Sequence, residues 1–423
     1  AKFSLRGHES RPKDRSRMPT KCPRNENFGK LGAGYLFPVV AKKRREFAAA
    51  HPDAKVISLG IGDTTYPLPA KIAGAMAAYS NGLATKEGYE GYDPKSEGVL
   101  KERIAKELYK GLDIAADEVF VSDGSKCDLG RLQLLFGSTA KVAVQDPAYP
   151  VYVDSSVIAG RTGTQDDATK QYAGITYMPC GPDNGFFPDI NLAKDSDVIM
   201  FCNPNNPTGA CATKAQMESV VKFANEHGKI ILYDSAYSAY ISDPACPKSI
   251  FEIEGAKQCA IESTSFSKLA GFTGIRLGWV VCCKELVWPD GTPVKQDLGR
   301  IMSTLFNGAA SVSQAGGLAV LDNMDEIDKI VKFYMENAKL IRECFDEIGI
   351  KYYGGINAPY TFVHFPGRDS WEVFDEILTK CQVVTTPGVG FGPAGQGFVR
   401  ISAFGDRDNV IEACKRFRSA FKK

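Results

Sequence analysis

The chain has 423 residues, of which 44% are hydrophobic and 24% are charged, and its formal net charge is +1. Such a composition is typical of a soluble globular protein that is large enough to bury a substantial core. The balance of 51 basic against 50 acidic residues argues against nucleic-acid binding, which needs a clear basic excess. No apolar run approaches the roughly 18 residues of a transmembrane helix, so we expect no membrane partner.

The cysteines and histidines give no sign of a metal site. Twelve cysteines are scattered without a Cys-x-x-Cys pair, and none of the four histidines lies at a ligand spacing. In a chain of this length, reduced and mostly buried thiols are the better interpretation, and they indicate a reducing compartment.

The first 30 residues differ from the rest of the chain because basic side chains dominate them. We expect residues 1–30 to form a flexible, solvated arm. The segment lacks an apolar h-region, so it is not a secretory signal; a mature end left after a transit peptide and a vector-altered start both remain open. Its charged residues are Lys2, Arg6, Arg11, Lys13, Arg15, Arg17, Lys21, Arg24 and Lys30, against Glu9, Asp14 and Glu26.

Beyond the arm, short apolar runs alternate with helical patterns. We expect strands at residues 56–62, 119–122, 142–145, 197–202, 230–234, 260–265 and 278–282. We expect helices at residues 70–84, 98–109, 127–136, 214–227 and 325–348, then short strands and a final helix. Apolar strands that alternate with helices predict a mainly parallel sheet in an α/β fold.

This order of elements also predicts how the chain divides into domains. We expect a large domain over residues 66–324, built on the mostly parallel central sheet with flanking helices. Residues 31–65 and 325–423 are expected to form a smaller α/β domain from both ends of the chain.

The segment Ser265–Arg276 (SFSKLAGFTGIR) is the most informative motif. Lys268 follows a strand directly, and a restricted pocket lowers the pKa of a lysine and frees its amine to attack an aldehyde. Ser265 and Arg276 are suited to charge-assisted bonds with a phosphate. Taken alone, the motif is equally compatible with a surface lysine beside a flexible loop.

Two further strand ends carry polar groups. Asp234 closes the apolar run 230–234, where ligand crevices of α/β sheets lie, and a carboxylate there can keep a pyridine nitrogen protonated. The alternative is a helix N-cap. The two-proline turn Asn203–Gly209 (NPNNPTG) can aim an asparagine at a ring oxygen, or it is simply a tight surface turn.

Three weaker motifs complete the set. Asp123–Lys126 (DGSK) precedes a helix, where free N–H groups favour a phosphate, although it lacks the P-loop pattern. Asp146–Tyr152 (DPAYPVY) offers an aromatic ring for stacking on a flat ligand. Arg400 lies in an apolar strand and needs a partner such as a ligand carboxylate. The glycine-rich segment 388–397 is expected to be a loop.

In this order, the motifs resemble the fold type I pyridoxal-phosphate enzymes of the class I and II aminotransferase superfamily, over nearly the whole chain from about Asn27. Further segments are similar to the LL-diaminopimelate aminotransferases, most of all to the plant and algal form. These segments are Leu31–Phe37, Ile57–Thr65, Val121–Asp128, Ala270–Trp279 and Val384–Gly392.

The resemblance implies pyridoxal 5'-phosphate as cofactor, linked covalently to Lys268, with its pyridine nitrogen paired to Asp234. It also implies that Tyr149 stacks on the ring, while Asn206 and Tyr237 bond its hydroxyl oxygen. The implied phosphate ligands are Ser125, Lys126, Ser265, Ser267, Arg276 and Tyr92 of the partner subunit.

For the substrate, the resemblance implies that Arg400 binds the α-carboxylate. The other implied substrate contacts are Tyr35, Gly62, Glu97, Lys126, Tyr149, Asn206 and Asn307 of the partner subunit. One segment departs from the family, which reads GYGxEQG after the shared tyrosine. Here Gly91-Tyr92 is followed by Asp-Pro-Lys95-Ser-Glu97, so Lys95 takes the usual glutamate position and the carboxylate is displaced to Glu97.

The function implied by the resemblance is a homodimeric aminotransferase of lysine biosynthesis with shared active sites. It would interconvert LL-2,6-diaminopimelate plus 2-oxoglutarate with tetrahydrodipicolinate plus glutamate. Its small-molecule partners would be dicarboxylate amino and keto acids. The expected location is the chloroplast stroma for a plant or algal source and the cytoplasm for a bacterial one. The alternatives are another class I aminotransferase, for aromatic or small amino acids, a pyridoxal-phosphate lyase or synthase, and a non-catalytic regulator. The regulator would need a DNA-binding domain, for which the arm is too short.

Overall fold

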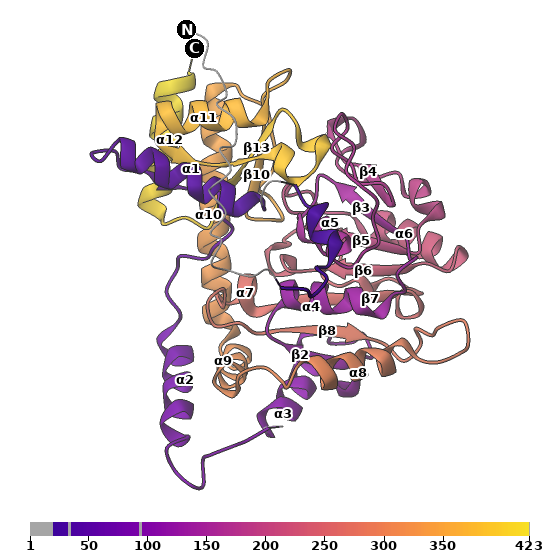
Figure 1. Cartoon of the computed structure of the whole chain (residues 1–423). Helices are drawn as coiled ribbons and strands as arrows, with labels where there is room; N and C mark the ends of the chain where they lie inside the picture. Colours follow the sequence, from indigo (N-terminus) through magenta and orange to yellow (C-terminus); the bar gives the residue numbers. More distant parts are fainter. Residues whose placement is uncertain (1–19, 33–34, 93–94, 423) are drawn as a thin grey trace.

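A seven-stranded sheet forms the centre of the larger part of the molecule (Figure 1). The computed structural model describes residues 20–32, 35–92 and 95–422. The strand order is β2-β8-β7-β6-β5-β3-β4. β8 runs antiparallel to β2 and β7, and every other pair of neighbours is parallel. The strands are β2 (Val119–Ser122), β3 (Val142–Asp146), β4 (Ile175–Pro179), β5 (Val198–Cys202), β6 (Ile230–Asp234), β7 (Ala260–Ser265) and β8 (Gly278–Cys282).

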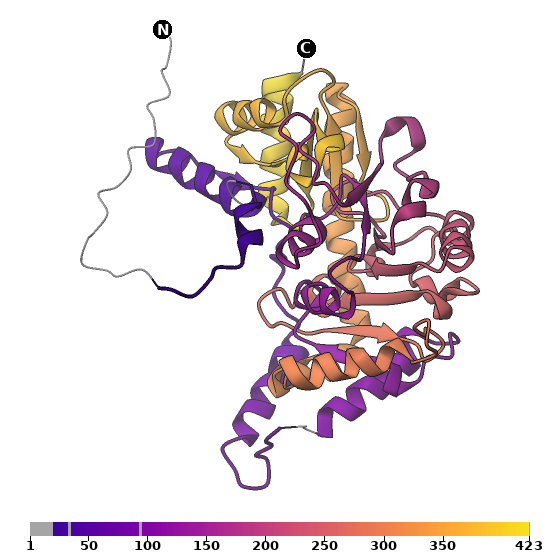
Figure 2. The same cartoon turned by 45° about the vertical axis from the view of Figure 1, so that its right-hand side comes forward.

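Helices flank this sheet on both sides, as Figures 1 and 2 show. Every residue of β3, β5, β7 and β8 is buried, which is why the sequence shows continuous apolar runs rather than alternation. The mostly parallel sheet with flanking helices is confirmed. The helices of this part are α2 (Ala70–Gly82), α3 (Lys95–Arg103), α4 (Ser125–Leu132), α5 (Val151–Ile158), α6 (Lys214–Glu226), α7 (Phe266–Leu269), α8 (Val294–Leu305) and α9 (Ser311–Leu321).

Both ends of the described chain build a second, smaller unit, at the upper left of Figure 1. An antiparallel sheet has the order β12-β13-β10-β9, and β1 pairs with β11 in parallel. Its strands are β1 (Ile57–Ser58), β9 (Tyr352–Gly354), β10 (Tyr360–His364), β11 (Val383–Val384), β12 (Thr386–Pro387) and β13 (Phe398–Ser402). Its helices are α1 (Leu36–Ala50), α11 (Ser370–Cys381) and α12 (Arg407–Phe421).

The long helix α10 (Met324–Ile348) passes from one hydrophobic core into the other. Ile330 and Tyr334 pack in the core of the large sheet, whereas Ile341 and Phe345 pack in that of the small unit. The two units therefore share one rigid element. The division of the chain at residues 65 and 325 stays a prediction.

Some predicted elements differ from the structure. The expected strand at 56–62 is reduced to β1, because the chain leaves β11 after Leu59, whose N–H donates to the Val384 carbonyl at 2.9 Å. The expected helix at 98–109 starts earlier, as α3, and continues as a π-helical segment, Ile104–Leu108. The predicted loop at 388–397 contains two short 3₁₀ turns.

The predicted N-terminal arm falls partly outside the described residues, since 1–19 are not among them. From residue 20 onward the chain reaches the large unit, where the Lys30 ammonium donates to the Thr162 carbonyl at 2.6 Å. All twelve cysteines are free, and nine of them are buried. No helix in the described part of the chain is long and apolar enough to span a membrane.

Asn337, fully buried on α10, ties this helix to the end of β13. Its amide donates to the carbonyls of Ala403 and Gly405 at 3.0 and 2.9 Å. We predict that Asn337→Leu lowers the free energy of unfolding by about 3 kcal/mol, because two buried carbonyls lose their donor. Denaturant titration measures this loss. The exposed Lys339 on the same helix provides the control, and Lys339→Ala should change stability by less than about 0.5 kcal/mol. Equal effects of both changes would contradict the prediction.

Candidate active site

Most of the predicted site residues meet where the parallel strands of the large sheet end. Register pairs place Cys202 beside Asp234 and Asp234 beside Ser263, so β5, β6 and β7 open onto one edge. Such carboxyl-end edges are where α/β sheets bind ligands. A cavity of about 290 Å³ lies there. Its lining includes Gly62, Ser125, Lys126, Tyr149, Asn206, Asp234, Tyr237, Ser265, Ser267, Lys268 and Arg276.

Lys268 lies in α7, the short helix that follows β7, and its side chain is half-buried. Its ammonium donates to the Gly62 carbonyl and lies 5.2 Å from the centre of the Phe404 ring. Burial lowers the pKa of Lys268 to about 8; Asp63 opposes the shift, while Arg400 and Arg276 add to it. At pH 7 about a tenth of this lysine therefore carries the nucleophilic free amine, far more than for an ordinary lysine.

Asp234 is 4% exposed, and both of its carboxylate oxygens accept a hydrogen bond. The Tyr152 hydroxyl donates to Oδ2 at 2.7 Å, and the Ala236 N–H donates to Oδ1 at 3.0 Å. Burial raises the pKa of Asp234, and these two hydrogen bonds lower it. The carboxylate forms part of the cavity wall, so its remaining lone pairs are open to a ligand.

Hydrogen-bond donors for an anion converge at the start of α4. The Ser125 hydroxyl is buried there and has no partner among the described residues. Arg276 donates to the Ser267 hydroxyl at 3.2 Å, and a Cβ added at Gly124 would lie 2.5 Å from its guanidinium. Only glycine therefore lets Arg276 approach this helix end, where free N–H groups favour a phosphate.

Arg400, on β13, is 1% exposed and reaches the cavity through Asn206. Its Nη1 donates to the Asn206 side chain and its Nη2 to the Gly60 carbonyl, both at 2.6 Å. The Nε has no partner among the described residues. The Asn206 amide also donates to the Tyr237 hydroxyl at 3.5 Å, which in turn bonds the Tyr360 hydroxyl at 2.8 Å. A buried guanidinium with a free donor suits a ligand carboxylate.

Lys126, which lines the cavity, lies beside Tyr35 and Asp154. The Lys126 ammonium is 4.8 Å from the centre of the Tyr35 ring. Burial raises the pKa of Asp154 to about 6, against the opposing charge of Lys126. Tyr35 has a buried hydroxyl without a partner among the described residues. The structure thus brings Tyr35 close to the predicted substrate residues.

Three predicted residues, Tyr92, Glu97 and Asn307, do not lie in this cavity. They line a separate hollow of about 400 Å³ between α3 and the end of α8. Glu97 pairs with Lys101 at 2.6 Å. Tyr92 is 86% exposed, and Asn307 is exposed as well. Within one chain these residues are apart from Lys268, and roles for Tyr92 and Asn307 at that site require a second copy.

Sequence reasoning missed Asp63, Tyr152 and Tyr360 as members of this site. Tyr360 comes from the small antiparallel sheet, and only the tertiary fold brings it to Tyr237. Tyr152 lies in the motif Asp146–Tyr152, where its spacing of three residues from Tyr149, about one helical turn, is the only sign that both side chains face the same place.

Among the described residues, one group of potential metal ligands lies away from the cavity. Side-chain atoms of Glu118, Cys283 and Glu285 lie within 4.8 Å of one another. Both Glu118 oxygens already accept N–H groups, from Ala115 and Lys284, each at 2.9 Å. These two hydrogen bonds already satisfy both oxygens of the buried Glu118 carboxylate, so a metal ion is not needed to explain its burial.

Comparisons with known proteins identify the family of this chain. Residues 54–417 match the family model described as "Aminotransferase class I and II". The "LL-diaminopimelate aminotransferase, chloroplastic" of Arabidopsis thaliana is 54% identical over 97% of this chain and 90% of its own length. The "LL-diaminopimelate aminotransferase" of Protochlamydia amoebophila is 49% identical, over 95% of this chain and 98% of its own.

A solved structure is similar over the same extent. The L,L-diaminopimelate aminotransferase from Chlamydomonas reinhardtii superposes with a TM-score of 0.91 at 56% identity, covering 95% of this chain and 99% of its own.

The lowered pKa of Lys268 predicts how the cofactor-free chain reacts with a small aldehyde. The reaction rate should rise with pH and level off above about pH 8, because the neutral amine is the nucleophile. Asp63→Asn should move the midpoint to lower pH, since the Asp63 carboxylate favours the charged ammonium. Trapping the adduct by reduction and locating it by mass spectrometry measures the rate at this one residue. Lys268→Arg is the control that removes the reactive amine, and an unchanged midpoint in Asp63→Asn would contradict this account.

Proposed function

The chain belongs to the class I and II aminotransferase family, and we propose that it moves an amine between LL-2,6-diaminopimelate and 2-oxoglutarate. The products in that direction are tetrahydrodipicolinate and glutamate, a step of lysine biosynthesis. The names of the relatives support this substrate. The observation that carries the proposal is that Lys268 and Asp234 line one cavity, which Arg400 reaches through its hydrogen bond to Asn206, and none of the three has an opposite charge at ion-pair distance among the described residues.

The residues present fit pyridoxal 5'-phosphate. Lys268 provides the amine for its aldehyde, Asp234 a carboxylate for the ring nitrogen, and Tyr149 a flat face. The unpartnered Ser125 hydroxyl and the Arg276 guanidinium offer the donors that a phosphate needs. We assign the rest of the phosphate and ring contacts to Lys126, Asn206, Tyr237, Ser265 and Ser267. When bound, this cofactor supplies an electron sink for the negative charge that develops at the substrate α-carbon.

The chain's own residues then hold the substrate and move its proton. Arg400 binds the α-carboxylate through its free Nε, which orients the α-carbon toward Lys268. With its pKa near 8, the Lys268 amine takes the α-proton as a base and returns it as an acid at the same pH. The aromatic rings of Phe37, Tyr360 and Phe391 around Arg400 keep water away from this charge pair.

The far end of the substrate is proposed to lie against Tyr35, Gly62 and Lys126. A side chain at position 62 would collide with the Tyr360 hydroxyl, so a glycine there keeps the space open. Tyr92 and Asn307 would reach the cavity from a partner subunit, which makes the proposed enzyme a homodimer with shared sites. Glu97 lies outside the cavity of its own chain and pairs there with Lys101; it is proposed to recognise the distal ammonium, for which it would also have to come from the partner subunit.

The proposed location depends on the source. For a plant or an alga we propose the chloroplast stroma, following the word "chloroplastic" in the name of the Arabidopsis relative. For a bacterium we propose the cytoplasm.

Amine transfer to 2-oxoglutarate tests the proposal directly. We expect glutamate to form with LL-diaminopimelate and with ping-pong kinetics, and Lys268→Ala to lose nearly all turnover because the base and the covalent link disappear. Parallel assays with meso-diaminopimelate and with aromatic amino acids separate the candidate substrates. Faster transfer from an aromatic amino acid would favour the other class I activity, and keto-acid release without glutamate would indicate a lyase.

Mixed dimers test whether the sites are shared. Lys268→Ala and Tyr92→Ala chains should each be weakly active or inactive alone, yet regain activity when they are mixed and allowed to exchange. One site of the mixed dimer then combines an intact Lys268 with an intact Tyr92 of the partner subunit. Glutamate formation before and after exchange measures this, and two Lys268→Ala preparations mixed together serve as the control. No gain in the mixture would contradict a shared site.

A further inference from the structure

Tyr152 lies beneath the candidate site and has no role in the reaction described above. It occupies the first turn of α5, is 1% exposed, and donates its hydroxyl to Asp234 Oδ2 at 2.7 Å. Burial raises the pKa of Tyr152 well above its usual value, so the phenol stays protonated and remains a donor. The hydrogen bond joins this tyrosine to the one carboxylate in the cavity wall that we assign to the cofactor ring.

The chain segment after β3 supplies two tyrosines to the same place. Tyr149 lines the cavity, and the Tyr152 N–H donates to its carbonyl at 3.2 Å, closing a turn. Their rings meet edge to face, with centroids 5.9 Å apart. One tyrosine thus presents a ring to the cavity while the other, one turn later, points its hydroxyl at Asp234 from behind.

The surroundings of Asp234 show why a donor is needed there. The side chain is nearly inaccessible to water, and an isolated buried carboxylate would take up a proton instead of staying charged. The only donors to its oxygens within hydrogen-bond distance in the described residues are the Tyr152 hydroxyl and the Ala236 N–H. The buried Cys202 thiol and the Tyr149 phenol also face it, and neither carries a positive charge.

We propose that Tyr152 is a positioning residue of the aminotransferase reaction: its hydroxyl orients Asp234 and keeps that carboxylate ionised. This inference rests on the proposed function, because it assigns Asp234 to the pyridine nitrogen. With its back oxygen bonded to Tyr152, Asp234 directs its free lone pairs into the cavity. The ionised carboxylate then holds the proton of the ring nitrogen, on which the electron sink depends.

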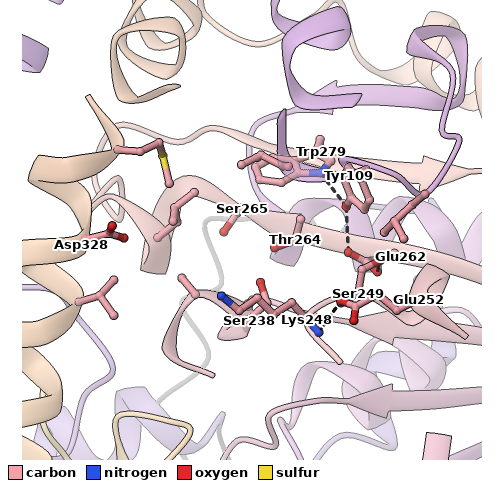
Figure 3. A pocket seen from close by; sticks show the side chains of 17 residues that line it. Tyr109, Ser238, Lys248, Ser249, Glu252, Glu262, Thr264, Ser265, Trp279 and Asp328 are labelled. Carbon is pink, nitrogen blue, oxygen red and sulfur yellow. Dashed lines mark hydrogen bonds between the residues drawn. The ribbon is translucent and has the colours of Figure 1, made fainter. Parts of the chain in front are cut away.

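The structure also offers a matched control, shown in Figure 3. Tyr109 is 3% exposed and donates to the buried Glu262 at 2.8 Å, beside a neighbouring cavity of about 200 Å³. Glu262 precedes Ser263, the register partner of Asp234, so it faces the opposite side of the sheet. Tyr109→Phe therefore removes the same kind of bond, from a buried tyrosine to a buried carboxylate, away from the proposed cofactor.

The experiment compares Tyr152→Phe, Tyr109→Phe and the unaltered holoenzyme. For Tyr152→Phe we expect the dissociation constant of pyridoxal phosphate to rise about tenfold and kcat to fall about tenfold, in line with losing one hydrogen bond to a charged group. The KM for the amino donor should stay within about twofold, because Arg400 and Lys126 are untouched. Tyr109→Phe should lower the melting temperature and leave these constants unchanged.

The pH dependence of visible absorbance is the readout that a purely structural role would not move. The pKa of the Lys268 amine is set by burial and by Asp63, Arg400 and Arg276, and all of these are unaltered in Tyr152→Phe. Without the Tyr152 hydrogen bond, Asp234 holds the proton of the ring nitrogen less firmly, so the ring carries less positive charge. The Lys268 nitrogen then keeps its own proton more easily, and the midpoint of the absorbance change should shift to higher pH. Fluorotyrosine at position 152 keeps the shape and strengthens the donor, and it should shift the midpoint to lower pH, even if Tyr152→Phe fails to fold.

A double-mutant cycle with Asp234→Asn completes the test. If Tyr152 acts through Asp234, adding Tyr152→Phe to Asp234→Asn should change the cofactor affinity little. Full additivity would overturn the inference, as would a melting-temperature loss like that of Tyr109→Phe with no shift of the midpoint. If the unaltered protein gains no visible absorbance with pyridoxal phosphate, the proposed function itself fails, and this inference with it.

Discussion

The chemistry of this site depends on buried charged side chains that have no charged partner. Lys268 and Asp234 line one cavity, Arg400 is bonded to Asn206 in its wall, and none of the three has an opposite charge at ion-pair distance among the described residues. Burying an ion costs several kcal/mol unless dipoles replace the lost water. The fold provides such dipoles only in part: Arg400 bonds Gly60 and Asn206, while its Nε stays free. A ligand carboxylate would supply the acceptor that this buried guanidinium lacks.

Two independent packing units must dock correctly to create this arrangement. The parallel sheet delivers Asp234 and Lys268 at its carboxyl edge, whereas Arg400 comes from β13 of the antiparallel sheet. The Tyr334 hydroxyl on α10 accepts the N–H groups of Thr65 and Tyr66 at 2.8 and 2.7 Å, which fixes the chain that leaves β1. Because α10 belongs to both cores, any tilt of this helix changes the distance between Arg400 and the lysine.

The sequence was most informative where strands are completely buried. Continuous apolar runs predict β5, β6 and β7, and the polar residue that ends each run predicts the site edge. Prediction failed for α1, which buries only Leu36 and Val40 and so shows no sustained apolar stripe. It also overlooked α11, although Val373, Phe374, Ile377 and Leu378 have helical spacing. Tyr360 and Tyr152 could not be assigned, because their partners are distant in sequence and a hydroxyl has no pattern of its own.

The hollow that holds Tyr92, Glu97 and Asn307 is the surface that a second chain would cover in the proposed dimer. Tyr92 in this hollow is 86% exposed, and Tyr89 and Leu305, close to hollow residues in sequence, are also more than half exposed; exposed apolar groups of this size are often sites of association. A second copy seated on this surface would cover them and would bring donors toward the unfilled side of the cavity. In the proposed dimer, the contacts that bury these apolar side chains would also bring Tyr92 and Asn307 of the partner subunit to the phosphate and the substrate. Assembly and catalysis would then be coupled, because a dissociated chain would lose ligands as well as stability.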